Sequence, residues 1–247
     1  MSKRAVILAG GIGSRLRPYT VVLPKPLMPI GEFPILEVVI RQLIHYGFDH
    51  ITLAVNHQAE IIQSYFNSGS KWGITIDYSL EKKSLGTMGP LRLIDDLPDN
   101  FLVMNGDVLT DFNYEKFYRE HLSGEQIFSI ASSLRMQQSE FGVLDVDSKR
   151  NLYGFREKPM VHYEVSMGIY MLSKEVLQFI PHDQFFGFDE LMLQFLELQE
   201  QVKVVPHEGY WLDIGRPDDY MKAIDIFEEQ QDLFLKKNYV ESPALRP

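Results

Sequence analysis

The first half of the chain alternates short apolar runs with segments of helical periodicity. Apolar runs that end in glycine or polar turns predict strands covered on both faces, as in a parallel sheet. Apolar positions spaced three and four residues apart predict helices, which Asn or Gly then terminates. The predicted strands are residues 5–8, 51–55, 74–78 and 101–104, and the predicted helices are residues 35–46, 59–66 and 90–97.

The second half has a more mixed pattern. Strands are predicted over residues 128–134, 142–146, 152–156 and 166–172, and helices over residues 190–200 and 218–234. The last ten residues contain two prolines and little periodicity, which is typical of a loosely attached end. Since no linker or repeat divides the chain, we expect one domain over residues 1–235 and a C-terminal tail over residues 236–247.

This order of elements predicts the fold and the place of its ligands. Strands that alternate with helices favour an α/β fold with a Rossmann-like, doubly wound, mixed but mainly parallel sheet. Ligands of such sheets bind outside the carboxyl ends of the strands. Two glycine-containing turns, residues 8–10 and 105–107, follow predicted strands directly, so both should reach one crevice.

Composition narrows the classes of function. The 247 residues carry a formal net charge of −10, which disfavours binding of a nucleic-acid backbone by bulk charge. The absence of cysteine excludes disulfides, thiolate catalysis and cysteine-based zinc sites, and it fits a cytoplasmic protein. The apolar run at residues 5–9 is too short for a signal peptide, and no stretch approaches the roughly 18 apolar residues of a membrane-spanning helix.

The first chemical motif is AGGIGSRLRP at residues 9–18, followed by PKP at residues 24–26. Its glycines allow close approach of the backbone, whose N–H groups can form a nest for phosphate oxygens. Arg15 offers phosphate a bidentate fork, and the two prolines fix the projection of Lys25. The alternative is a tight turn with solvated cations. The spacing fits neither the dinucleotide-binding fingerprint nor a Walker loop.

Two aspartates are candidate metal ligands. Asp107 follows a buried strand and Asn-Gly, where a carboxylate that faces the phosphate loop suits Mg²⁺. The alternative is a turn aspartate that accepts from its own backbone. Asp213 lies between two apolar residues and therefore needs a partner or a metal. Asp218 and Asp219 fit the N-terminal cap of the last helix better than Asp213 does.

A further motif, FREKP, occupies residues 155–159. If its backbone is extended, Glu157 and Lys158 point to opposite sides. The functional interpretation places Lys158 on a sugar phosphate and Glu157 on sugar hydroxyls. The alternative is two solvated charges at a strand end.

Together these motifs resemble those of the sugar-1-phosphate nucleotidyltransferases, also called nucleotide-sugar pyrophosphorylases. The resemblance rests on AGGIGSRLRP with PKP, NGD, FREKP and WLDIG in this order, and it spans about residues 4–229. The segment EKKSLGTMGPL at residues 81–91 looks most like the mannose-1-phosphate guanylyltransferase branch. The longer guanylyltransferases add a left-handed β-helix, and we expect no C-terminal β-helix in a chain of this length.

The resemblance implies Mg²⁺-dependent transfer of a nucleotide from an NTP to a sugar 1-phosphate. Since the substrate phosphate is itself the nucleophile, catalysis needs only positioning and charge neutralisation. The implied roles are catalysis for Arg15, Lys25 and Asp107; nucleotide binding for Leu8, Ala9, Gly10, Gly11, Gly13, Glu81, Gly86 and Thr87; sugar-phosphate binding for Gly142, Glu157, Lys158 and Ser166; and Mg²⁺ binding for Asp107 and Asp213.

The residue at position 81 bears on the choice of base. Thymidylyl and uridylyl members have Gln where this chain has Glu81, five residues before Gly86. A carboxylate only accepts hydrogen bonds, which suits guanine N1–H and its N2 amine, whereas uracil would place a carbonyl against it. This favours GTP, with UTP, CTP and dTTP as alternatives. In another interpretation Glu81 turns outward with Lys82 and Lys83.

The motifs identify neither the sugar of the sugar 1-phosphate nor the oligomeric state. Ser166 stands where the family often has an Asn that contacts the sugar, so mannose, heptose or another hexose 1-phosphate remain candidates. A non-catalytic nucleotide-sugar sensor should have lost one of the charged residues that the chain retains: Arg15, Lys25, Asp107 and Asp213. The oligomeric state, including a homo-oligomer, cannot be inferred from the sequence.

Overall fold

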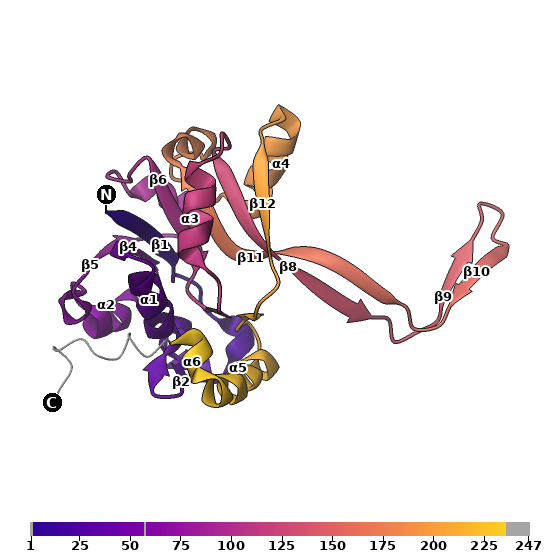
Figure 1. The fold of residues 1–247 in the computed structure, drawn as a ribbon, viewed down its shortest axis with the longest axis horizontal. Helices are drawn as coiled ribbons and strands as arrows, with labels where there is room; N and C mark the ends of the chain where they lie inside the picture. Colours follow the sequence, from indigo (N-terminus) through magenta and orange to yellow (C-terminus); the bar gives the residue numbers. More distant parts are fainter. Residues whose placement is uncertain (1, 57, 236–247) are drawn as a thin grey trace.

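A computed structural model describes residues 2–56 and 58–235 (Figure 1). Its central seven-stranded sheet has the spatial order β12 (Val202–His207), β8 (Phe128–Gln138), β11 (Met160–Ser173), β6 (Asn100–Asn105), β1 (Lys3–Leu8), β4 (Phe48–Val55) and β5 (Thr75–Leu80). Strands β6, β1, β4 and β5 are parallel, as are β12 and β8, whereas β11 is antiparallel to both of its neighbours. The predicted α/β fold with a mixed, mainly parallel sheet is therefore confirmed.

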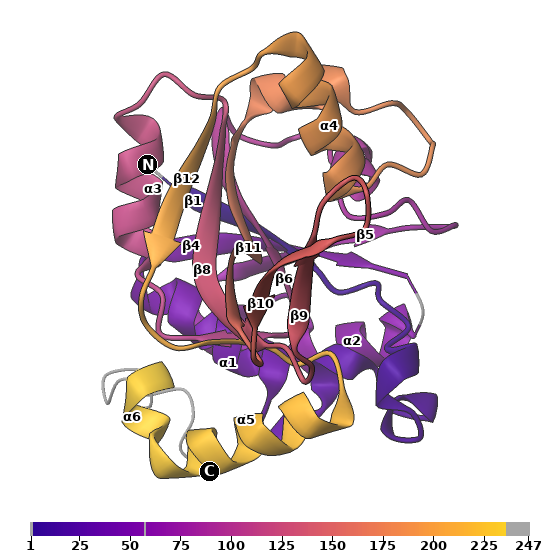
Figure 2. The same cartoon turned by 90° about the vertical axis from the view of Figure 1, so that its right-hand side faces the viewer.

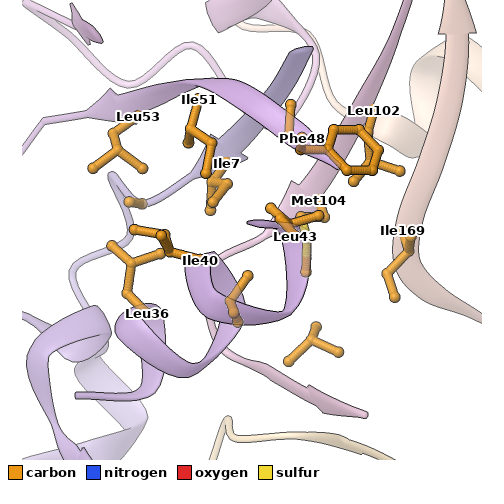
Figure 3. Close-up of a cluster of buried hydrophobic side chains, with 14 of the residues drawn as sticks. Ile7, Leu36, Ile40, Leu43, Phe48, Ile51, Leu53, Leu102, Met104 and Ile169 are labelled. Atoms are coloured by element: carbon orange, nitrogen blue, oxygen red, sulfur yellow. The ribbon is translucent and has the colours of Figure 1, made fainter. Parts of the chain in front are cut away.

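Helices cover both faces of this sheet (Figure 2). One face packs against α1 (Ile35–His45), α2 (Ala59–Phe66) and α3 (Tyr114–Leu122), and the other against α4 (Phe188–Leu198) and the 3-10 segments η5 (Gly89–Leu93) and η6 (Lys174–Phe179). Since successive side chains of a strand point to opposite faces, Ile7 is buried with the first group and Val6 with the second. Figure 3 shows Leu36, Ile40 and Leu43 of α1 in the first cluster.

A third apolar cluster joins the C-terminal helices to α1. Phe227 of α5 (Pro217–Glu229) and Phe234 of α6 (Gln231–Phe234) are buried with Val38. Two small antiparallel pairs flank them, β2 (Pro29–Ile30) with β3 (Phe33–Pro34) and β7 (Val108–Thr110) with β13 (Trp211–Asp213). The remaining 3-10 segments are η1 (Ser14–Leu16), η2 (Tyr19–Val21), η3 (Lys25–Leu27) and η4 (Ser70–Trp72).

Several sequence-based element predictions are wrong. The predicted helix over residues 90–97 is only the short segment η5, which ends at Leu93 because Ile94 has an extended backbone, with φ −110° and ψ 102°. The predicted helix over residues 218–234 breaks at Gln230, whose φ is −132°. The pattern missed α3, whose buried stripe is narrow, and β12, an edge strand in which Pro206 is tolerated.

Strands β8 and β11 extend well beyond the residues predicted for them. Their outer halves and the hairpin of β9 (Val143–Val146) and β10 (Leu152–Arg156) form a long projection, which we call the arm and define as residues 134–164 (Figure 1). No residue of the arm is buried. A pattern of apolar residues therefore does not identify a core strand here.

The predicted tail over residues 236–247 lies outside the described residues. The boundary at residue 235 therefore stays a prediction. Within residues 2–56 and 58–235 there is no β-helix, and none of the helices there has the length and apolar character needed to cross a membrane.

Candidate active site

A crevice lies at the carboxyl ends of the parallel strands. Strand β1 pairs with β6, with Leu8 opposite Asn105, so the turns that follow these strands are neighbours. Two adjoining hollows share Leu8, Gly11 and Asp107. The first is lined further by Ala9, Gly13, Ser14, Arg15, Lys25, Pro26, Gly106 and Gly215, and the second by Gly10, Asn56, Glu81, Ser84, Gly86, Thr87 and Asn105.

The glycine loop is shaped by close contacts at two positions. A Cβ at Gly10 would lie 2.9 Å from Glu81 Oε1, so any larger residue would displace that carboxylate. Gly13 has a φ of +64°, which L side chains rarely adopt, and its carbonyl accepts a 2.7 Å hydrogen bond from Thr20 Oγ1. These contacts fix the backbone conformation of the glycine loop, which lines the crevice.

Two cations and a carboxylate meet in the first hollow. Lys25 begins η3, and its Nζ forms an ion pair with Oδ2 of Asp107. Both side chains are largely buried, with exposures of 12% and 17%. Arg15, in η1, lines the same hollow from the opposite end of the loop. The charged groups predicted to act on phosphates therefore lie together.

Asp213 joins this group through the pairing of β13 with β7. In this pair Asp213 lies opposite Val108, and the Ile214 N–H donates a 3.1 Å hydrogen bond to the carbonyl of Asp107. Burial and the nearby charge of Asp107 raise the pKa of Asp213, while Lys25 and Arg15 act in the opposite direction. The two carboxylates are thus close enough to repel each other.

This pair of carboxylates has the properties of an incomplete cation site. Oδ1 of Asp107 is buried and has no hydrogen-bond partner, so it is available to a ligand. Among the described residues, no group of three or more His, Asp or Glu side chains could hold a metal ion. Mg²⁺ is commonly held by one or two carboxylates together with water and substrate phosphates. Asp107 and Asp213 therefore fit a cation whose remaining positions are filled by water or by the phosphates of a ligand.

Glu81 faces the second hollow from below the glycine loop. It is 8% exposed, and its Oε2 accepts a 3.2 Å hydrogen bond from the Leu85 N–H. Burial raises its pKa, partly offset by that hydrogen bond. The interpretation that turns Glu81 outward is therefore wrong, and Lys83 pairs instead with Asp183, at 3.0 Å.

The segment after Glu81 is held against the start of α4. A Cβ at Gly86 would lie 2.6 Å from the carbonyl oxygen of Phe186. Thr87 Oγ1 accepts a 2.7 Å hydrogen bond from the N–H of Phe188. These contacts fix the wall of the second hollow and leave Gly86 and Thr87 lining it.

The residues predicted to bind the sugar phosphate do not line the crevice. Gly142, Glu157 and Lys158 lie on the arm, where Glu157 and Lys158 are exposed. A Cβ at Gly142 would lie 3.0 Å from Glu157 Oε2, so these two are neighbours. Ser166 lies at the base of the arm, and its Oγ accepts from the N–H of Gly168 at 3.2 Å.

The bulge that contains Ser166 adjoins the crevice. A Cβ at Gly168 would lie 2.5 Å from Nδ2 of Asn105, which lines the second hollow. The adjacent carbonyl of Met167 accepts a 3.0 Å hydrogen bond from Trp211 Nε1. Ser166 is thus near the crevice without lining it.

Sequence reasoning missed several lining residues. Asn56 follows Val55 at the carboxyl end of β4, so the rule applied to the other strand ends could have found it. Ser14, Ser84 and Gly215 also line the hollows, and all three lie within quoted motifs.

The comparisons with known proteins agree with this site. Residues 4–230 match the Nucleotidyl transferase family. The UTP--glucose-1-phosphate uridylyltransferase of Synechocystis sp. is 34% identical over 241 residues, which cover 90% of this chain and 62% of that protein. The mannose-1-phosphate guanyltransferase of Candida albicans is 32% identical over 235 residues, covering 91% and 64% respectively. The chain thus spans less than two thirds of these relatives.

A solved structure extends the comparison to the fold. HddC from Yersinia pseudotuberculosis, complexed with GMP-PN, is 28% identical and superposes with a TM-score of 0.69. The match covers 91% of this chain and 99% of that one. The resemblance stated from the motifs is confirmed, and the chain belongs to the nucleotidyl transferase family, together with the sugar-1-phosphate nucleotidyltransferases that it resembles.

Proposed function

We propose that the protein transfers a nucleotidyl group from GTP to a sugar 1-phosphate and releases pyrophosphate. The observation that carries this proposal is that Arg15, Lys25 and Asp107 line the crevice beside the glycine loop, with Asp213 close to Asp107. A triphosphate is bound by cations and backbone N–H groups along its length, and this crevice is lined by two cationic side chains and by the glycine loop. Relatives that act on sugar 1-phosphates support the acceptor class.

The reaction requires no nucleophile from the protein. An oxygen of the sugar 1-phosphate attacks the α-phosphorus of GTP, a new P–O bond forms, and the bond to the β-phosphate oxygen breaks, so that pyrophosphate leaves with the electron pair. Arg15 and Lys25 offset the charge on the transferring and leaving phosphates. Asp107 and Asp213 are the residues that would hold Mg²⁺, which supplies further positive charge to the phosphate oxygens.

Three observations favour guanine as the base. Glu81 is buried beneath the glycine loop, where an ionised carboxylate can accept from two adjacent donors. HddC has been solved with GMP-PN, and several relatives are mannose-1-phosphate guanyltransferases. The similarity to a UTP-dependent enzyme makes UTP the second candidate.

A substrate panel tests the proposal. The purified protein is incubated with GTP, UTP, CTP or dTTP, Mg²⁺, and mannose, glucose or heptose 1-phosphate, while pyrophosphate release and the mass of the product are measured. We expect release only with GTP and one class of sugar phosphate. Release only with UTP would overturn the choice of base, and no release with any pair would overturn the activity.

Glu81→Gln should weaken the use of GTP. Hydrogen bonds to charged groups contribute about 1.5–3 kcal/mol, so kcat/KM for GTP should fall by about 10–100-fold, while UTP is used better. In the wild type, KM for GTP should rise as pH falls, and at a higher pH than for an ordinary glutamate, because burial raises the pKa of Glu81. The Gln variant should lack this pH dependence.

Steady-state kinetics over a pH series measures both effects. The exposed Glu60→Gln on α2 is the matched control, because it makes the same chemical change at a residue that lines neither hollow. Unchanged GTP kinetics in Glu81→Gln would remove Glu81 from the base site.

Mg²⁺ without nucleotide should raise the melting temperature by a few degrees. A ligand at ten times its Kd stabilises a protein by about 1.4 kcal/mol, and each kcal/mol corresponds to about 2–4 °C in a chain of this size. The cation needs both carboxylates ionised, and the pKa of Asp213 is raised. The Mg²⁺-dependent increase should therefore be present above that pKa and disappear as pH falls through it.

Thermal unfolding with Mg²⁺, or with NaCl at equal ionic strength, checks this prediction. Asp213→Asn should abolish the increase at neutral pH. An equal increase in the variant, or with NaCl, would argue against a cation at the two aspartates.

A further inference from the structure

The arm exposes an unusual amount of apolar surface. Leu134, Met136, Phe141, Tyr153 and Phe155 of the arm are 58–76% exposed. Monomeric proteins rarely leave contiguous apolar patches larger than a few hundred Å² uncovered. The arm therefore has the character of a surface that another part of a protein covers.

The hairpin at the tip of the arm has one apolar and one polar face. Phe155 lies opposite Leu144, and Leu152 lies opposite Val146, so these four side chains share one face. The other face carries the ion pair of Arg156 with Asp145, at 2.9 Å. Glu157 Oε2 lies against Gly142, at the edge of the apolar face. Whatever covers the apolar face is thus brought next to Glu157.

The orientation of the arm is fixed at its base, where its strands continue into the central sheet. An unbroken antiparallel register runs from Met160 opposite Gln138 to Ser166 opposite Ser132. On one face Ser132 donates a 2.7 Å hydrogen bond to Glu164, and on the other the Arg135 guanidinium lies 4.4 Å from the Trp211 ring centroid. The hairpin consequently projects away from the body of its own chain (Figure 1).

The loop beside the crevice also exposes apolar side chains. Ile12, Tyr19, Val21 and Val22 are 53–78% exposed in the loop that includes Gly13 and Arg15, and we call these four residues the rim. The crevice lacks the residues expected on the sugar phosphate, and the arm carries them. Each chain thus has an exposed apolar arm that carries Glu157 and Lys158. It also has an exposed apolar rim beside a crevice that lacks these two residues.

We propose that the arm docks on a second copy of this chain, with its apolar face against the rim, and supplies Glu157 and Lys158 to that copy's site. The inference rests on the proposed function for the role of these two residues. A two-fold dimer satisfies both arms and both rims at once. The sugar phosphate is then bound between the crevice of one chain and the hairpin of the other.

The exposed area is sufficient for a stable dimer. Phe141, Tyr153 and Phe155 expose roughly 400 Å² of side-chain surface in each arm, taking about 150–250 Å² for a whole aromatic side chain. Two arms and the surfaces that receive them would bury about 1,600 Å², which equals the usual size of a stable interface.

Two measurements test the proposal. By sedimentation equilibrium the wild type should be a dimer, and the double variant L144S/F155S should be a monomer. Arg156→Ser, on the polar face of the same hairpin, should remain a dimer. A monomeric wild type, or a double variant that stays dimeric, would overturn the docking surface whether or not the protein is an active nucleotidyltransferase.

The second measurement asks which chain uses the arm. Asp107→Asn and Lys158→Ala, each expected to be inactive, are co-expressed with different tags, and the heterodimer is purified through both tags. In the exchanged dimer one of its two sites combines an intact crevice with an intact arm, so it should regain about half of the wild-type activity. A heterodimer as inactive as its parents would show that each arm serves its own chain. Full activity of Lys158→Ala alone would show that the arm supplies no needed cation.

Discussion

Replacement of Asp107 by Asn should lower kcat by about 10²–10³-fold, because charge stabilisation by a bound metal is worth several kcal/mol and each 1.36 kcal/mol is a factor of ten. The substitution preserves the shape of the side chain and removes its charge. It removes the ionic partner of Lys25 and one of the two neighbouring carboxylates, Asp107 and Asp213. The folded structure should persist, since the side chain lines the first hollow and is not part of the apolar core.

Pyrophosphate release at saturating substrates, measured over a series of Mg²⁺ concentrations, checks this result. If Asp107 binds the cation, the variant should need more Mg²⁺ for its residual rate. Asp111→Asn is the control, because Asp111 pairs with His207 at 2.9 Å and lies outside the hollows. A variant with wild-type kcat and Mg²⁺ dependence would remove the metal assignment.

Arg15→Ala should lower kcat by roughly 10³-fold, the lower end of the effect of arginines that stabilise phosphoryl-transfer transition states. Arg15 is exposed, and its side chain reaches toward Gly215 and Asp213 across the hollow. Its loss should therefore change catalysis without unfolding the protein. Arg15→Lys should restore only part of the rate, because an ammonium group cannot reproduce the bidentate fork.

The neighbouring Arg17→Ala is the matched control, since Arg17 is also exposed and does not line the crevice. Melting temperatures of all three variants should equal that of the wild type. A rate loss in Arg17→Ala as large as that in Arg15→Ala would assign the effect to the loop as a whole.

Much of the nucleotide half of the site could be predicted from local sequence. The carboxyl ends of parallel strands meet at one edge of a sheet, so the turns after residues 8 and 105 had to be neighbours once both strands were recognised. The same rule accounts for the glycine loop and for Asp107. It would also have identified Asn56, which follows β4.

Other features depend on contacts that no local pattern encodes. Asp213 reaches Asp107 because β13 pairs with β7 across more than 100 residues of sequence, as in the pairing of Leu212 with Leu109. The inward position of Glu81 is set by the Leu85 N–H and by the space above Gly10. The pattern of apolar residues in the arm is the same for a buried strand and for an exposed strand, so the sequence could not distinguish the two.

The sequence by itself determined the class of fold and the chemistry available, because strand burial, glycine conformations and charged side chains are properties of short segments. The tertiary structure alone decided where Glu157 and Lys158 lie. Their position follows from the register of β8 with β11, which carries the hairpin away from the body, and register is set by pairing between strands distant in sequence.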